Sequence, residues 1–313
     1  MSRSVLRLGT RKSPMALAQS GQVAKLITER TGKTVEMVGL TSFGDVTTAE
    51  LTQVGGTGVF VSALRESLLA ADIDVAVHSL KDLPTTALPG ITLAAVPVRD
   101  DPRDALAGRD GAKLADLPPG ARVGTGSPRR AAQLRLLRAD ICPVAVRGNA
   151  GTRLAKVTAG EVDAVVLAYA GLARIGQLDR VSEVFDANEM VPAPGQGALA
   201  VECCDTEPGL AALLACVDDP ASRAAVTAER TVLADLQAGC SAPVGAYAAG
   251  TEVLHLTAVV MGDNGTALRA SASGPMAEAA KLGRAVAADL LRRGARTAMA
   301  AAAGSMSDGD DKQ

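Results

Sequence analysis

The stretch over residues 72–84, Asp-Ile-Asp-Val-Ala-Val-His-Ser-Leu-Lys-Asp-Leu-Pro, constrains the fold more than any other part of the chain. Its largely apolar run over residues 73–77 is bounded by a polar cluster and then by a proline, which is typical of a buried strand in a mostly parallel sheet. In open α/β sheets the ligand binds outside the carboxyl ends of the strands. We therefore predict that the polar residues after this strand lie at a binding site: His78, Ser79, Lys81 and Asp82.

Asp82 is the candidate catalytic residue of this stretch. A carboxyl group beside Lys81 can hold or release a proton according to what else is bound, as general acid/base catalysis requires. The alternative at this point is a polar turn without chemistry, because loops of this kind follow many buried strands.

Charge and composition exclude several classes of partner. The length of 313 residues suits two or three domains. The net charge of −2 provides no basic field that would attract nucleic acid or a membrane surface. Aromatic residues are scarce, with no Trp, two Tyr and three Phe, which argues against stacking on single-stranded nucleic acid. We therefore expect neither a nucleic-acid partner nor a membrane partner.

The five cysteines form an odd set without metal-type spacing, and there are only two histidines, so we expect no metal site. Cys142, Cys203 and Cys216 lie in apolar segments and Cys204 abuts one, where a buried structural thiol is the expectation. Cys240 instead lies in a Gly-Cys-Ser loop, where a thiol can act as a nucleophile or a covalent anchor. Unpaired cysteines indicate a reducing compartment, and the sequence shows no signal-like apolar start and no bilayer-length apolar run. We expect a soluble, cytoplasmic protein.

Apolar runs that alternate with helical segments predict an α/β fold. Besides the strand at 73–77, strands are predicted over residues 5–8, 35–41, 91–98, 144–146, 164–168 and 198–203, the last of which could return to the first unit. Helices are predicted over about 14–30 and 59–70. The loop over 42–58 suggests a lid, and Phe60, two residues after it, is assigned to the lid as well. A polar turn over 100–104 marks the passage into a second unit.

The pattern changes after residue 207. Helices over 207–217 and 221–238 precede strands over 246–249, 253–261 and 267–273 and a helix over 276–293, which indicates a small α+β domain. The predicted domains are residues 1–98 with 195–215, residues 99–194, and residues 216–299. The small, polar tail over 300–313 is expected to be disordered.

Two strand-to-helix turns share one architecture. Ser13 is a good helix N-cap before Pro14, which places Arg11 and Ser13 where helix amides favour an anion; a simple cap is the alternative. The turn over residues 123–130, Val-Gly-Thr-Gly-Ser-Pro-Arg-Arg, repeats this arrangement. In this half of the chain the predicted strands lead into arginines: Arg129, Arg130, Arg147, Arg153 and Arg174.

Several guanidinium groups at one sheet edge repel one another unless a ligand brings carboxylates or phosphates, which arginine binds bidentately. The ligand is therefore predicted to be polyanionic. The alternative, solvated surface arginines, fits Arg135 and Arg138 on the following helix better than it fits the residues at strand ends.

Distinctive motifs follow one another along nearly the whole chain: Arg11-Lys-Ser-Pro, Val54-Gly-Gly-Thr-Gly, His78-Ser-Leu-Lys-Asp, Asp101-Pro-Arg-Asp, Gly124-Thr-Gly-Ser-Pro-Arg-Arg, Arg147-Gly-Asn-Ala-Gly-Thr-Arg, Pro194-Gly-Gln-Gly and Gly239-Cys-Ser-Ala-Pro. In this order they resemble the hydroxymethylbilane synthase, or porphobilinogen deaminase, family. The resemblance implies two α/β domains that look like periplasmic binding proteins, an active site in the cleft between them, and a small C-terminal α+β domain.

The resemblance also implies the chemistry. A dipyrromethane cofactor would be linked as a thioether to Cys240, and four porphobilinogen units would be joined to it head to tail with loss of ammonia and release of hydroxymethylbilane. Asp82 matches the catalytic carboxylate. The cofactor-binding positions are Lys81, Ser127, Arg129, Arg130 and Arg147, and the substrate-binding positions are Arg11, Ser13, Arg153, Arg174 and Gln196. A monomer is expected.

The chain departs from the family pattern in two places. Ala238 stands where the cofactor loop commonly has a first glycine, and Gln53 and Thr57 stand where many members carry lysines in the lid. An alternative from another class is a cytoplasmic solute-binding protein for a small polycarboxylate, because the same architecture serves that role without catalysis. A nucleotide-dependent enzyme lacks a matching glycine fingerprint.

Overall fold

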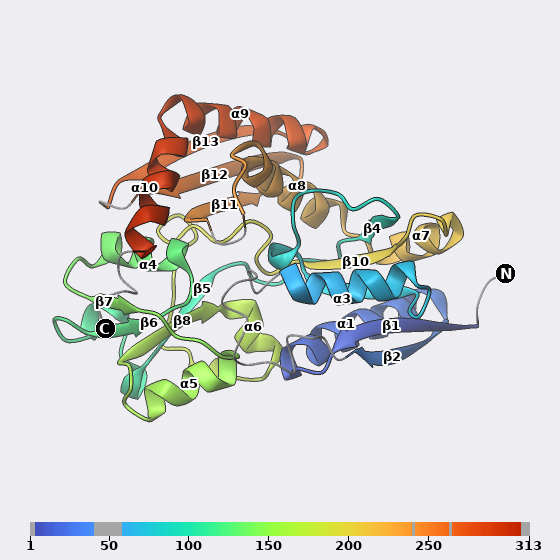
Figure 1. Cartoon of the computed structure of the whole chain (residues 1–313), viewed down its shortest axis with the longest axis horizontal. Coiled ribbons are helices and arrows are strands. Elements are labelled where there is room, and N and C mark those ends of the chain that lie inside the picture. Colours follow the sequence, from blue (N-terminus) through green and yellow to red (C-terminus); the bar gives the residue numbers. More distant parts are fainter. Residues whose placement is uncertain (1–3, 41–57, 240–241, 263–264, 308–313) are drawn as a thin grey trace. The chain divides into compact units, whose positions relative to one another are not determined.

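The computed structural model describes residues 4–40, 58–239, 242–262 and 265–307. The chain divides into two compact units, Met1–Asp100 with Ala198–Arg223, and Asp101–Gly197 with Ala224–Gln313. The α/β class is confirmed, because each unit contains a five-stranded sheet flanked by helices and the second unit adds a small three-stranded sheet (Figure 1). The boundaries of the three predicted domains remain a prediction.

The sheet of the first unit has the strand order β2-β1-β3-β10-β4. Its strands are β1 (Val5–Arg11), β2 (Thr34–Leu40), β3 (Val75–Ser79), β4 (Ile91–Ala95) and β10 (Leu199–Cys204). Strand β1 pairs in parallel with β2 and β3, while β10 is antiparallel to both β3 and β4. The predicted return of the chain to the first unit is therefore confirmed, with β10 lying between β3 and β4.

Helices cover both faces of this sheet. Helix α1 (Pro14–Thr31) and α7 (Pro208–Leu214) contribute Val23, Ile27 and Leu214 to one core, and α3 (Gly58–Leu69) packs Leu64 and Leu68 on the other face. Helix α1 begins as predicted, with the Ser13 side chain accepting a hydrogen bond from the Ala16 amide, and it ends at Gly32 in the left-handed conformation.

The second unit repeats the parallel arrangement, with the strand order β7-β6-β8-β5-β9. Its elements are β5 (Asp104–Gly108), β6 (Arg122–Gly124), α4 (Pro128–Leu137), β7 (Cys142–Val144), α5 (Ala150–Thr158), β8 (Ala164–Ala168), α6 (Tyr169–Arg174) and β9 (Glu183–Val184). Strand β6 is parallel to β7 and β8, and β5 is antiparallel to β8. The three parallel strands therefore end at one edge, and β5 begins there.

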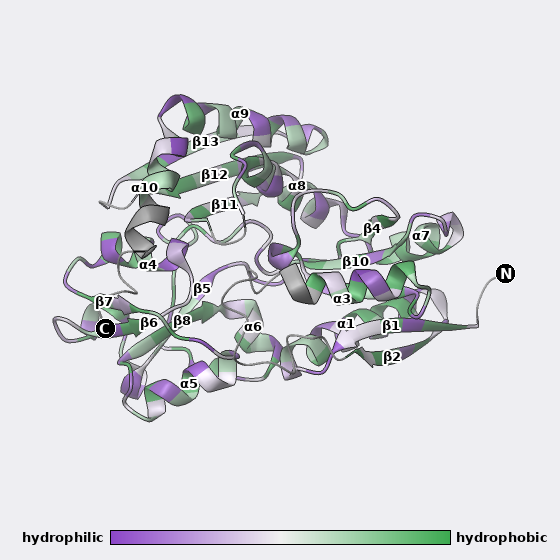
Figure 2. Cartoon of the chain, viewed as in Figure 1, coloured by the Kyte–Doolittle hydropathy of each residue, from purple (hydrophilic) through white to green (hydrophobic). Residues whose placement is uncertain are grey.

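The small C-terminal α+β arrangement is also confirmed. It contains α8 (Pro220–Asp235), β11 (Val244–Ala249), β12 (Val253–Met261), β13 (Ala267–Pro275), α9 (Ala279–Arg292) and α10 (Ala295–Ser307). The three strands form an antiparallel sheet, and one aliphatic core joins it to the helices. Figure 2 shows the apolar character of β12, whose last four residues are all buried.

Four expectations differ from the structure. Strand β5 begins inside the segment predicted as a polar turn over 100–104, and the strand predicted over 91–98 ends at Ala95. The expected disorder from residue 300 is wrong as far as Ser307, because α10 continues to that residue, as its high alanine content favours. Cys142 and Cys216 are exposed rather than buried, since Cys142 opens the edge strand β7 and Cys216 lies in a single turn after α7.

Among the residues that the structure describes, no helix is long and apolar enough to cross a bilayer. The same residues contain no group of three or more His, Cys, Asp or Glu side chains that could hold a metal ion.

Candidate functional site

In the first unit, β1 and β3 are neighbouring parallel strands, so their carboxyl ends lie at one edge of the sheet. Arg11 ends β1, and Ser13 caps the helix that follows. Gln19 of that helix donates a hydrogen bond of 2.7 Å from Nε2 to the Oγ atom of Ser79, the last residue of β3. The predicted anion-binding turn therefore adjoins the end of the strand that leads to Asp82.

Lys81 and Asp82 lie in a short 3₁₀ helix, Leu80–Asp82, directly after β3. The amide of Leu80 donates to the carbonyl oxygen of Ala198 at 3.0 Å, and the side chains of Leu80 and Leu83 are buried on either side of the polar pair. Lys81 and Asp82 remain partly exposed. The fold thus holds the backbone firmly while it leaves the ammonium and carboxylate groups accessible, as the sequence pattern predicts.

His78 does not belong with these accessible residues. Its Nε2 atom lies 3.3 Å from Oε2 of Glu202, and Glu202 also receives two hydrogen bonds from Arg65 of α3, at 2.9 and 2.7 Å. All three side chains are largely buried. Placing His78 at the binding site was therefore wrong, because successive residues of a strand point to opposite faces of the sheet.

In the second unit, the turn before α4 also forms as predicted. The Oγ atom of Ser127 accepts a hydrogen bond from the amide of Arg130, and Pro128 is the first helical residue. Arg129 and Arg130 follow, and both side chains are almost fully buried, with exposed fractions of 3% and 7%. They are therefore not solvated surface arginines.

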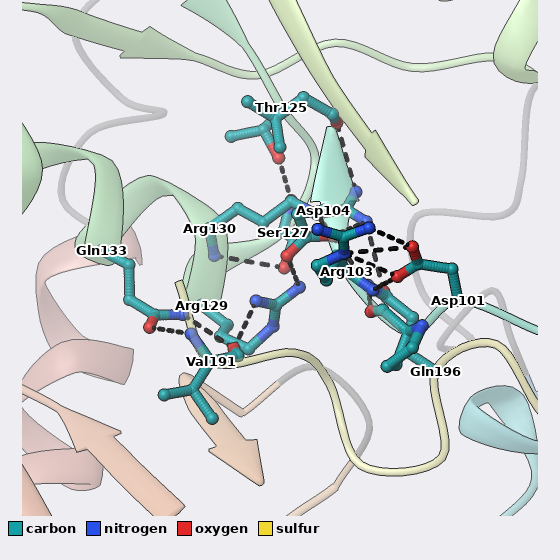
Figure 3. A network of polar contacts seen from close by, with 12 residues as sticks. Asp101, Arg103, Asp104, Thr125, Ser127, Arg129, Arg130, Gln133, Val191 and Gln196 are labelled. Carbon is teal, nitrogen blue, oxygen red and sulfur yellow. Dashed lines mark hydrogen bonds and ion pairs between the residues drawn. The ribbon is translucent and has the colours of Figure 1, made fainter. Parts of the chain in front are cut away.

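The partner of both arginines is Asp104, the first residue of β5. Its Oδ1 atom accepts from Nε and Nη2 of Arg130 at 3.0 and 2.7 Å, and its Oδ2 atom lies 2.8 Å from Nη2 of Arg129 (Figure 3). Burial disfavours the charged form of this carboxyl group, but the two guanidinium groups hold the pKa of Asp104 well below its ordinary value. The sequence did not identify Asp104 as functional; a carboxylate that opens a buried strand was the available signal.

Gln196 joins the same network. Its Nε2 atom donates to Oδ1 of Asp104 at 2.8 Å and to the carbonyl oxygen of Pro102 at 2.7 Å, and its Oε1 atom accepts from Arg130 at 3.3 Å. Gln196 is fully buried. The structure thus brings Gln196 together with Arg129 and Arg130, two of the residues predicted to bind the ligand.

The segment that carries Gln196 is held at several points. Nη1 of Arg129 and Nε2 of Gln133 both donate to the carbonyl oxygen of Val191, at 2.7 and 3.1 Å (Figure 3). From α8, the buried carboxylate of Glu229 accepts from the amides of Gly195 and Ala248 at 2.7 and 2.8 Å. In sequence, α8 precedes Cys240 and β11 follows it, so elements on both sides of Cys240 also fix the position of the segment with Gln196.

The other predicted arginines differ from this pair. Arg147, three residues after β7, is exposed, while Arg153 of α5 is partly buried and donates from Nε to the carbonyl oxygen of Gly148 at 2.8 Å. Burial, and then the charge of Arg130, lower the pKa of Arg153. Arg174 donates to the carbonyl oxygen of Gly197 at 2.7 Å.

Two predicted site residues lie partly or wholly outside the described structure. Phe60 belongs to α3 by its backbone, but its side chain is not described, and the predicted lid over residues 42–58 falls almost entirely within the undescribed residues 41–57. Cys240 also lies outside the described residues. Its role as the attachment point is a prediction.

Comparisons with known proteins match these observations to one family. A family model described as "Porphobilinogen deaminase, dipyromethane cofactor binding domain" matches residues 6–212, and one described as "Porphobilinogen deaminase, C-terminal domain" matches residues 223–292. Curated relatives named porphobilinogen deaminase include one from Thermobifida fusca, which is 58% identical over 97% of this chain and 98% of its own. One from Acidothermus cellulolyticus is 54% identical over 93% of this chain and 90% of its own.

A relative from Streptomyces coelicolor, named porphobilinogen deaminase 1, is 51% identical over 94% of this chain and 97% of its own. The solute-binding alternative is not favoured, because the family models and these relatives cover both units and the C-terminal domain. The chain therefore belongs to the porphobilinogen deaminase family.

Proposed function

We propose that this protein joins four porphobilinogen molecules head to tail on a dipyrromethane primer held by the Cys240 thiol, with loss of one ammonia for each unit added, and that water then releases the product from the primer as hydroxymethylbilane. The observation that carries the proposal is the charge balance at the strand ends of the second unit. Arg129 and Arg130 share a single carboxylate, that of Asp104. Arg147 and Arg153 have no ion pair with a carboxylate among the described residues.

This donor set fits the proposed ligand. Pyrroles of this kind carry acetate and propionate groups, which arginine and lysine bind through charge-assisted hydrogen bonds. We assign Lys81, Ser127 and four arginines, Arg129, Arg130, Arg147 and Arg153, to the carboxylates of primer and substrate. Arg11, Ser13, Arg174 and Gln196 complete the proposed binding set, and Phe60 is proposed to act from the lid.

When bound, the dipyrromethane would supply the free pyrrole α-carbon to which the units are added. The protein's own part is to hold carboxylates and to manage charge and protons at the reacting substrate. Loss of ammonia from the aminomethyl group of porphobilinogen leaves a cation, which a nearby carboxylate stabilises. Asp82 is the proposed carboxylate, and its oxygen would also accept the proton that is released when the new bond forms.

The anchoring of Asp82 suits this role. The hydrogen bond from Leu80 to Ala198 and the burial of Leu83 fix the backbone on both sides of Lys81 and Asp82. A carboxylate on a rigid support can be placed within hydrogen-bonding reach of the reacting atoms at little entropic cost.

We also propose that the protein acts as a cytoplasmic monomer without a nucleic-acid or membrane partner. The near-neutral net charge and the five cysteines without a disulfide or metal pattern support this proposal.

Intact-mass measurement tests the proposed function. The purified protein should be heavier than its sequence by one dipyrromethane, and Cys240→Ser should have the sequence mass alone. Cys142→Ser is the matched control, because Cys142 is an exposed thiol remote in sequence from the loop, and it should keep the added mass. A wild-type protein at its sequence mass, or an added mass that persists in Cys240→Ser, would contradict the proposal.

A further inference from the structure

Asp104 lies at the edge of the sheet where the predicted ligand-binding residues gather. It pairs in register with Ala168, the last residue of β8, so the antiparallel strand β5 begins where the parallel strands end. Its side chain is fully buried and has three contacts with guanidinium groups and one with an amide. A carboxylate in this position is the resident counterion of the Arg129–Arg130 pair.

The charges of this cluster do not cancel. Two guanidinium groups face one carboxylate, which leaves one excess positive charge in a nearly buried place. Arg153, a partly buried residue of α5, adds a further positive charge nearby; its burial, and after it the charge of Arg130, lower its pKa. An unpaired buried charge is costly, so the arrangement is favourable for an incoming anion.

The arginine pair also has N–H groups that could donate hydrogen bonds to an anion. Arg130 donates four hydrogen bonds, to Asp104, Val166 and Gln196. A guanidinium group has five N–H groups, so one remains to donate to a ligand. The buried Nε atom of Arg129 has no hydrogen-bond partner within the described part of the chain. Asp104 therefore fixes both side chains while it leaves donors unused.

We propose that Asp104 is a positioning residue, which holds Arg129 and Arg130 in place before a ligand binds and limits the excess charge of the pair to one. Without it, the two guanidinium groups repel each other and have no common acceptor. The identity of the natural anion, a pyrrole carboxylate, rests on the proposed function. The inference that the cluster binds an anion does not rest on the proposed function.

Thermal unfolding of the full-length chain tests this inference. The chain carries Cys240→Ser, so that no group attached there competes, and it is compared in sodium chloride and in sodium sulfate at equal ionic strength. In chloride, Asp104→Asn should lower the Tm by roughly 10 °C, because it strands two buried guanidinium groups. Sulfate should restore at least half of that loss, since it supplies the missing negative charge.

Asp140→Asn is the matched control. Asp140 forms a two-pronged pair with Arg138, with both distances at 3.0 Å, but at the surface. This variant keeps the Asp104 cluster and loses a paired carboxylate elsewhere, so it shows whether sulfate compensates for the loss of any paired carboxylate. Its Tm should stay within about 2 °C of the parent, and its response to sulfate should equal that of the parent.

A double variant separates charge from packing. Asp104→Asn with Arg129→Gln returns the cluster to one excess charge, so it should be more stable in chloride than Asp104→Asn alone and should respond to sulfate like the parent. The inference is overturned if Asp104→Asn responds to sulfate no more than the parent, or if the double variant is no more stable than the single one. If Asp104→Asn is insoluble, a soluble double variant supports the inference and an insoluble one overturns it.

The ligand is tested separately in the chain that retains Cys240. Asp104→Asn should reduce the fraction of molecules that carry the added mass of the primer. If the sulfate response appears as expected but that fraction is unchanged, Asp104 stands as a positioning residue and the assignment of the arginine pair to the primer fails.

Discussion

Nη2 of Arg65 lies 2.7 Å from Oε1 of Glu202, and this ion pair joins α3 to β10 within the first unit. Nε2 of His78, in β3, lies 3.3 Å from the other oxygen, Oε2, to which Nε of Arg65 also donates at 2.9 Å. Burial raises the pKa of Glu202, but the hydrogen bonds and charges of Arg65 and His78 outweigh it and lower the pKa to about 2. His78 precedes Ser79, the last residue of β3, so the network supports the strand that leads into the 3₁₀ helix with Lys81 and Asp82.

The first prediction concerns acid stability. Because the pKa of Glu202 is about 2 in the folded protein and 4.5 ordinarily, its ionised form stabilises the fold above pH 4.5, and this contribution is lost as the pH falls toward 2. Glu202→Gln should therefore flatten the decline in unfolding free energy between pH 4.5 and 2, and at neutral pH it should cost about 3 kcal/mol by leaving Arg65 unpaired. Urea unfolding at a series of pH values measures both effects.

Glu161→Gln is the control for that series, because Glu161 pairs with Lys156 at the surface. It should change the unfolding free energy by no more than about 0.5 kcal/mol at any pH. Identical pH profiles for Glu202→Gln and the wild type would show that the buried carboxylate does not govern acid stability.

The second prediction concerns thiol reactivity. Burial, and after it the neighbouring acidic groups Cys204 and Glu202, raise the pKa of Cys203 to about 11, so its thiolate is scarce at pH 8. Cys142 and Cys216 are exposed. Iodoacetamide should label these two at least about tenfold faster than Cys203 in the folded protein. Peptide mapping after timed alkylation measures the rates, and equal labelling of all three would contradict the burial of Cys203.

Local features of the fold could be predicted from the sequence. Ser13 and Ser127 cap helices with the proline that follows each of them, and the alternation of apolar runs gives most strands to within a few residues. The position of Lys81 and Asp82 after a buried strand also follows from a local pattern. These signals act over a few residues, where the backbone and the nearest side chains decide the conformation.

Long-range pairings could not be predicted in the same way. Asp104 meets Arg130 across 26 positions, and Glu202 meets Arg65 across 137. The antiparallel pairing of β5 with β8 brings the first pair together, and the insertion of β10 beside β3 brings the second pair together. A single sequence shows the charges but not which of them share a buried site, which is why His78 was assigned to the wrong surroundings.

The third prediction divides the arginines by their surroundings. Arg147→Leu should leave the Tm within about 2 °C of the wild type, because Arg147 is exposed. It should still impair primer loading or chain extension, because a carboxylate of the proposed ligand loses its guanidinium partner. Arg129→Leu should lower stability as well, by about 3 kcal/mol, because Asp104 loses one of its two guanidinium partners.

Arg135→Leu is the control for this comparison, since Arg135 is also exposed but lies on the second half of α4. Thermal unfolding and single-turnover ammonia release are measured for all three variants. If Arg135→Leu were as inactive as Arg147→Leu, the assignment of Arg147 to the ligand would be wrong.

The last prediction is that Asp82→Asn keeps the fold and a preassembled primer but loses turnover. Asparagine retains the shape and one hydrogen-bonding oxygen, while it removes the negative charge and the basicity. In the proposed mechanism, stabilisation of the cation left by ammonia loss and acceptance of the proton both need the carboxylate. Single-turnover ammonia release should therefore fall at least about a hundredfold, the low end of what a positioned acid or base contributes.

Asp72→Asn serves as the matched control. Asp72 is an exposed aspartate in the same motif-bearing stretch, before β3 instead of after it, so its substitution should leave both the Tm and the release of ammonia unchanged. Both variants are compared with primer loading verified by intact mass, because an unloaded protein would be inactive for a different reason. Ammonia release by loaded Asp82→Asn at a rate near that of the wild type would refute the catalytic role of Asp82. The required carboxylate would then have to be another one.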